Sequence, residues 1–170
     1  LAATNASGNL VVTSGGSIGQ SGVLTVAGNT SLTAATDIIL NSTNAFAGTV
    51  AFSGVNVNLQ SAGNIALAAS AATGTLNLQA NNLTQTGILT VTGATTLNAG
   101  GDITLTNAGN DFKGEVIFNG RMVSLTDANN LAILTGTTVE DIHLVAGGNI
   151  SQSALGLLSI PGWTYLTAGA

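Results

Sequence analysis

The sequence lacks cysteine altogether, and its 170 residues include one proline, one histidine and only two basic residues. Without cysteine there is no disulfide framework and no Cys-ligated zinc or iron–sulfur site. Two basic residues cannot neutralise the phosphates of a nucleic acid, so we predict no nucleic-acid partner. No stretch of about 18 residues is free of Asn, Thr, Ser and Gly, so we predict that the chain does not span a membrane.

Charged residues are also scarce, at 5% of the chain, and aromatic residues make up 4%. An average soluble domain is roughly 25% charged. Hydrophobic residues still reach 45%, so the core must consist mainly of Leu, Val, Ile and Ala. The net charge of −5 favours solubility.

The sequence repeats itself over a long period. Residues 22–40 match residues 87–105 at an offset of 65, as from Gly22 to Gly87, and the offset becomes 66 beyond Leu40. A third, partial copy begins near Ile142. The chain therefore consists of about two and a half copies of one unit, and we treat residues 1–170 as a single segment of a longer fibrous chain or filament.

A shorter period lies inside the long one. Small residues followed by Asn, Asp or Ser and then Ile or Leu recur at spacings of 18–28 residues. These motifs lie near Ile18, Ile38, Ile65, Leu83, Ile103, Leu131 and Ile150. Between them, apolar residues alternate with Thr, Ser or Asn, as in half-buried strands, whereas no 3.6-residue stripe predicts a helix.

These periods predict an all-β fold, a parallel β-helix (solenoid) of about eight coils of 18–28 residues with a long repeat of 65–66 residues. Coils stacked at about 4.8 Å would form a rod on the order of 35–40 Å long. Asn side chains at repeated corners can bond from coil to coil, and we expect Asn64, Asn130 and Asn149 to form such a ladder.

The run from Thr96 to Leu134 resembles the repeats of filamentous-haemagglutinin-like exoproteins, which are bacterial adhesins exported by two-partner secretion. The phrases that carry the resemblance are AGGDITL, AGNDFKGEVIF, VSLTDANNL and AGGNISQSALGLLSI. The resemblance covers nearly all of the chain and implies a right-handed helix within a secreted or cell-surface fibre. It assigns no functional residue, because no functional motif of that family maps onto numbered positions.

Residues that could carry chemistry are few. His143 lies between inward Ile142 and Leu144, so we interpret it as a surface histidine. Asp37 and Asp102 each precede an inward Ile, and we interpret them as turn caps, because three coils would separate them by roughly 14–15 Å. We therefore predict no catalytic residue, no metal site and no cofactor.

Two clusters are candidates for contact with a partner or a sugar. Lys113, Glu115 and Arg121 fall in a stretch where the first copy is mainly neutral. Trp163 and Tyr165 replace small residues of the earlier copy, and exposed aromatic rings often contact sugars or protein partners.

The leading hypothesis is a non-enzymatic shaft of a bacterial surface fibre that serves adhesion, aggregation or biofilm formation. Its expected partners are adjoining repeats or other copies stacked end to end, with host or matrix glycans or proteins as further candidates. One alternative is a carbohydrate-binding or polysaccharide-degrading β-helix. A second is an ice-binding solenoid, although the outward positions mix Thr with Asn, Ser, Ala and charged residues.

Overall fold

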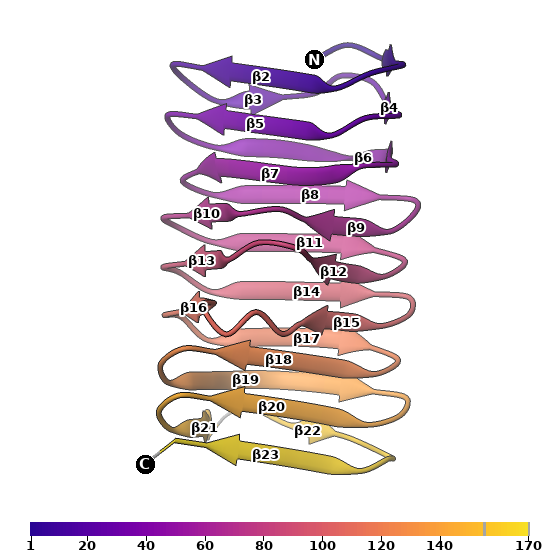
Figure 1. The fold of residues 1–170 in the computed structure, drawn as a ribbon. Coiled ribbons are helices and arrows are strands. Elements are labelled where there is room, and N and C mark those ends of the chain that lie inside the picture. The colour runs from indigo at the N-terminus through magenta and orange to yellow at the C-terminus, as the bar shows by residue number, and fades with distance from the viewer. Residues whose placement is uncertain (155, 170) are drawn as a thin grey trace.

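The computed structural model describes residues 1–154 and 156–169. Over these residues the chain forms a solenoid of about nine coils without a helix (Figure 1). Each coil contributes to two facing sheets, and every strand pairing is parallel. Seen from the N-terminal end in Figure 1, the chain turns clockwise as it recedes, so the solenoid is right-handed. The predicted parallel β-helix is confirmed.

The two sheets contain 11 and 12 strands. The 11-stranded sheet consists of β1 (Thr4–Ala6), β3 (Ile18–Gly19), β4 (Leu24–Val26), β6 (Ile38–Phe46), β8 (Val57–Ser61), β11 (Leu76–Ala80), β14 (Thr95–Ala99), β17 (Val116–Gly120), β19 (Leu131–Thr138), β21 (Ile150–Gln152) and β22 (Leu158–Ser159). The 12-stranded sheet consists of β2 (Leu10–Ser14), β5 (Thr30–Ala34), β7 (Thr49–Gly54), β9 (Ile65–Leu67), β10 (Ser70–Ala72), β12 (Leu83–Gln85), β13 (Leu89–Val91), β15 (Ile103–Leu105), β16 (Asp111–Phe112), β18 (Val123–Asp127), β20 (Ile142–Ala146) and β23 (Thr164–Ala168).

Two edges join the sheets. At the right edge in Figure 1 the chain passes from the 11-stranded to the 12-stranded sheet, and at the left edge it returns. Paired strands fix the coil length, which is 19 residues from Ile38 to its partner Val57 and 22 residues from Ile142 to its partner Thr164. The longest spacings in the sequence pattern arise differently, because they join opposite sheets. Ile38 lies in β6 of one sheet and Ile65 in β9 of the other.

The long repeat spans three and a half coils, so each copy occupies the sheet opposite to the copy before it. β4 of the 11-stranded sheet is equivalent in sequence to β13 of the 12-stranded sheet, and β8 is equivalent to β18 in the same way. Equivalent residues therefore do not stack on one another. Phe52 stands beside Leu32 in one sheet, and its equivalent Phe118 stands beside Leu97 in the other.

The core fills the space between the two sheets along the whole solenoid. Strand residues alternate between buried and less buried positions, as the period-2 pattern predicts. Each buried Leu, Ile or Val contributes roughly 1.5–3 kcal/mol. The fully buried members include Leu40, Leu59, Leu78, Leu97 and Val116.

Side chains at the corners link successive coils. The Asn130 side-chain oxygen accepts a hydrogen bond from the backbone N–H of Asn149 at 2.8 Å, and Asn56 accepts one from Thr75 at 3.0 Å. An Asn or Asp before a strand thus caps the corresponding corner of the next coil. The three asparagines expected to form one ladder lie at two different edges, however. Asn130 and Asn149 lie at the left edge, whereas Asn64 lies at the right edge and accepts a hydrogen bond from Asn82.

Candidate functional site

The two candidate aromatic residues lie in the last coil, and both are exposed. The exposed fraction is 71% for Trp163 and 52% for Tyr165. Tyr165 is the strand partner of His143, and the two rings meet edge to face with centroids 6.1 Å apart. His143 is exposed, as the alternation predicts. The Trp163 backbone N–H donates to the Asp141 carboxylate at 2.8 Å, which fixes the corner before β23.

The candidate charged residues do not form one patch. Lys113 and Glu115 lie at the left edge, where the Lys113 ammonium is 3.5 Å from the Asp111 carboxylate. Arg121 lies at the right edge, where it binds Asp102 of the preceding coil and Glu140 of the following coil. These ion pairs raise the pKa of Arg121. The flattened cross-section separates residues that are close in sequence.

Asp37 and Asp102 lie at opposite edges of the solenoid, so the structure does not bring these carboxylates together. Asp37 accepts hydrogen bonds from the backbone and side-chain nitrogens of Asn56, whereas Asp102 pairs with Arg121 at 2.6 Å. Both side chains thus link neighbouring coils. Among residues 1–154 and 156–169, no three His, Cys, Asp or Glu residues are grouped as a metal site would require. The same residues include no helix that is long and apolar enough to cross a membrane.

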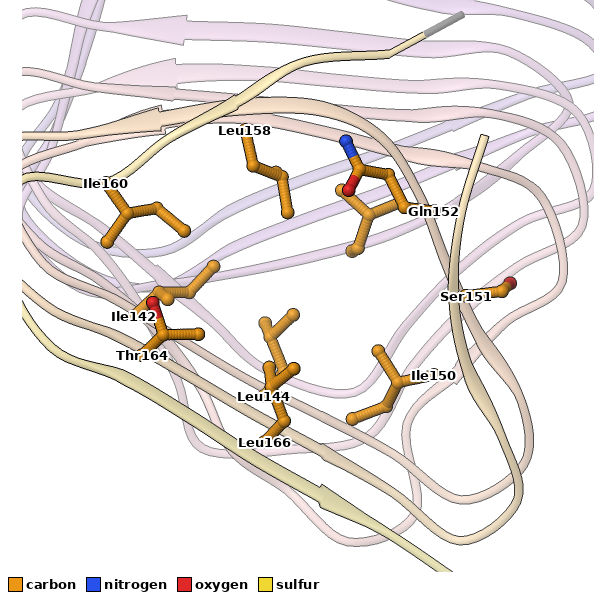
Figure 2. Close-up of a pocket in the computed structure, with 10 residues that line it drawn as sticks. Ile142, Leu144, Ile150, Ser151, Gln152, Leu158, Ile160, Thr164 and Leu166 are labelled. Carbon is orange, nitrogen blue, oxygen red and sulfur yellow. The ribbon is translucent and has the colours of Figure 1, made fainter. Parts of the chain in front are cut away.

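An apolar surface lies at the C-terminal end of the core, which we call the core end. It holds a pocket of about 150 Å³ (Figure 2). In Figure 2 the side chains of Leu158, Ile160 and Leu166 point into this pocket, whereas Ser151 points away. Leu166 lines the pocket and is 58% exposed. The pocket is lined by Ile133, Ile142, Leu144, Ile150, Ser151, Gln152, Leu158, Ile160, Thr164 and Leu166.

A buried amide pair links neighbouring coils of the 11-stranded sheet near the N-terminal end. Asn44 is fully buried, and its side-chain oxygen accepts hydrogen bonds from the Gln20 side chain and from the backbone N–H of Leu24, both at 2.9 Å. Its nitrogen donates to Gln20 Oε1 and to the carbonyls of Leu40 and Gln60. Asn44 therefore connects three consecutive coils at the point where β6 shifts its register.

The second copy of the repeat contains the same pair in the opposite sheet. Asn110 is also fully buried and accepts hydrogen bonds from the Gln85 side chain at 2.8 Å and from Leu89 N–H at 3.0 Å. Its nitrogen donates to Gln85 Oε1 and to the carbonyls of Leu105 and Thr126. Five hydrogen bonds of Asn44 thus have direct counterparts at Asn110. Backbone groups buried at an interruption of a strand need partners, and the inward Asn supplies them.

One buried carboxylate lies next to this second network. Asp127 is 1% exposed and accepts hydrogen bonds from the backbone N–H groups of Phe112 and Asn129. Burial raises the pKa of Asp127, while these two hydrogen bonds lower it in part and the nearby Asp111 charge raises it further. The equivalent residue of the first copy is Ser61, whose hydroxyl accepts a hydrogen bond from Gly63 N–H.

The inward positions of Asn44, Asn110 and Asp127 were not predicted, because Asn and Asp were expected at corners and on outer faces. A signal was present, since Gln20 and Gln85 recur at the 65-residue offset and each is followed 24 or 25 residues later by an Asn. A polar pair that recurs within strands at the long period indicates a fixed internal contact.

The fold and the core define a parallel β-solenoid repeat protein. The chain belongs to a family described as repeats of unknown function (DUF5649), which matches residues 1–53, 54–119 and 120–170. The complete middle repeat begins at the end of β7 and finishes in β17, and so passes from one sheet to the other. No curated protein and no solved structure matches the chain.

Proposed function

We propose that this chain is a length of the structural shaft of a bacterial fibre, secreted or held at the cell surface, and that it carries out no catalysis. The observation that carries the proposal is the apolar core, which runs between the two sheets through the coils that the structure describes. A core of this kind makes a rod of coils that stack along one axis. The partners of the shaft are then adjoining repeats stacked along its axis.

The links between coils support a load-bearing role. Neighbouring coils share parallel strand pairs, corner caps such as Asn130 to Asn149, and the inward residues Asn44 and Asn110 that each connect three coils. In a solenoid each coil contacts only its neighbours, so repeated links of this kind determine how the rod resists bending and unwinding. The resemblance to filamentous-haemagglutinin-like repeats supports the assignment to an adhesive fibre that serves adhesion, aggregation or biofilm formation.

Immunogold electron microscopy of cells that produce the native protein tests this proposal. Antibodies raised against the purified chain are expected to label thin fibres that extend from the surface, with repeated labels along one fibre. Labelling confined to the cell interior, or to compact particles without an extended shape, would overturn the proposal. Antibodies adsorbed with the purified chain provide the control.

A second candidate function is glycan contact at the last coil, favoured by the exposure of Trp163 and Tyr165. Aromatic rings can stack on sugar rings. Because Trp163 is the only tryptophan, its fluorescence reports binding directly. Glycan binding that quenches this fluorescence and is lost in Tyr165→Ser would support this function, and unchanged fluorescence across a glycan panel would contradict it.

The two remaining alternatives have weaker structural support. An ice-binding face needs a regular outward array, but the outward column of the 12-stranded sheet runs through Thr84, Thr104, Ser124 and His143. A polysaccharide-degrading site needs acidic groups close together, and Asp37 and Asp102 lie at opposite edges.

A further inference from the structure

The core end contains a third copy of the glutamine found in the two internal amide pairs. Gln152 terminates β21 as Gln20 follows β3 and Gln85 terminates β12. Its side-chain nitrogen donates to the Gly156 carbonyl at 3.0 Å, as Gln85 donates to Gly87. Gln152 therefore holds the orientation that its counterparts have in the completed pairs.

The other half of the pair is absent among the described residues. In the two internal pairs the Gln oxygen accepts a hydrogen bond from an Asn of the next coil, at 3.0 Å for Gln20 and 2.9 Å for Gln85. Among residues 1–154 and 156–169, no residue donates to the Gln152 oxygen. Leu158 is equivalent to Leu89, whose backbone N–H donates to Asn110, but no side-chain oxygen of the described residues accepts from the Leu158 N–H. Both groups border the pocket of the core end.

We propose that the core end binds a further coil of this repeat family that presents an inward asparagine, and that Gln152 is the residue that recognises it. This inference rests on the proposed shaft function and specifies the chemistry of the next coil. The incoming Asn oxygen accepts from Gln152 and from Leu158 N–H, and its nitrogen donates to the Gln152 oxygen. The aliphatic side chains of that coil cover Ile150, Leu158 and Leu166.

The first coil of a second copy does not meet this requirement. Its strand β1 places Thr4 and Ala6 toward the core, while Asn5 is exposed. A coil without an inward amide would bury the Gln152 oxygen and the Leu158 N–H without partners. An unpaired buried polar group costs about 1–3 kcal/mol. The core end therefore selects a coil that has the features of β6 or of the β15–β16 segment.

The chain supplies its own test coil. Strand β23 is equivalent to β14, so residues 102–120 can be appended after residue 170 in the natural order of the repeat. The appended coil brings a second Asn110 toward Gln152. A matched control carries Asn110→Leu in the appended coil only, which keeps the size and the apolar contacts but removes the amide.

Hydrogen exchange at the Leu158 amide and thermal unfolding are measured in the parent chain and in both extended chains. We expect the extension with Asn to slow Leu158 exchange by about tenfold and to give the highest Tm. In the control extension the new strand amides are protected while Leu158 exchanges as in the parent chain. Gln152→Met should lower the Tm of the Asn extension and raise that of the Leu extension, since Met and Leu leave only the Leu158 N–H unsatisfied instead of this N–H together with the Gln152 amide.

The outcomes separate the two proposals. Equal Leu158 exchange and equal Tm in the two extended chains would overturn the role of Gln152 and leave the shaft function standing. If the appended strands exchange freely in both extensions, the core end does not accept coils and the shaft function fails as well. Assembly of the parent chain into end-to-end filaments, seen by light scattering and electron microscopy, would overturn the selection of an Asn-bearing coil.

Discussion

The first and second copies of the long repeat, counted from Gln20 and Gln85, have nearly the same interior but different surfaces. Both copies bury a Gln–Asn pair with the same five hydrogen bonds, although the pairs lie in opposite sheets. In contrast, the second copy contains Lys113, Glu115 and Arg121 at positions where the first copy is neutral. The comparison shows that the core and its amide pair define the repeat, and that the surface can vary around them.

The largest expected effect comes from removing the inward amide. Asn44→Ala and Asn110→Ala each leave several buried polar groups without partners, so each should lower the free energy of unfolding by about 3 kcal/mol or more. The exposed residue Asn98 is the control, and Asn98→Ala should cost less than about 0.5 kcal/mol. Urea titration followed by circular dichroism measures all three variants. A cost for Asn44→Ala as small as that for Asn98→Ala would contradict the stabilising role of the inward amide, and unequal costs for Asn44→Ala and Asn110→Ala would show that the two pairs are not equivalent.

An intermediate effect is expected where the two interiors differ. Ser70 stands beside Phe52 in the first copy, whereas Gly136 stands beside Phe118 in the second, and a Cβ atom at Gly136 would overlap the Phe118 ring. Gly136→Ala should therefore destabilise the chain by about 1–3 kcal/mol through overpacking.

The matched control for this change is Gly63→Ala, because a Cβ atom at Gly63 meets no atom within 4 Å. Comparing the Tm values of both variants with that of the wild type measures the effect. If both substitutions change the Tm equally, Gly136 does not lie as close to the Phe118 ring as the structure places it.

The smallest expected effect concerns the carboxylate that replaces Ser61 in the second copy. Burial raises the pKa of Asp127 above its ordinary value of 3.8. The folded state therefore holds the carboxyl proton more tightly than the unfolded state does. The resulting stabilisation is fully present below pH 3.8 and is lost as the pH rises through the folded pKa.

Thermal unfolding of the wild type and of Asp127→Asn between about pH 3 and pH 7 tests this sign. Relative to the variant, the wild type should lose stability as the pH rises. The opposite trend would mean that the hydrogen bonds from Phe112 and Asn129 outweigh burial and lower the pKa.

Much of the fold could be predicted from sequence because its signals are local and repeated. Alternation in stretches such as Leu76–Ala80 gives the strands, and the positions of Asn and Asp before strands give the corners. The placement of successive copies in opposite sheets could not be predicted from the repeat alone. A period of 65 residues fits three coils of about 22 residues or three and a half coils of about 19, and only the pairing of Ile38 with Val57 distinguishes them.

The candidate sites were predicted less well, for a related reason. Lys113 and Arg121 are close in sequence, but β17 runs between them across the flattened coil and places them at opposite edges. Asn44 and Asn110 were overlooked because an Asn inside an alternating strand has the composition of an outward residue, and only its hydrogen bonds show that it points inward. Trp163 and Tyr165 are exposed, as is every residue of β23.

Disulfide trapping tests the central structural claim most directly, because the chain has no cysteine of its own. In the structure, where the long repeat spans three and a half coils, Thr33 stands beside Ser53. If the repeat instead spanned three coils of about 22 residues, Thr33 would stand beside Val55. Neighbouring strand residues lie about 4.8 Å apart, within reach of a disulfide. Thr33→Cys with Ser53→Cys should close an intramolecular disulfide under mild oxidation, while Thr33→Cys with Val55→Cys should remain reduced. Closure of the Val55 pair and not the Ser53 pair would contradict the account.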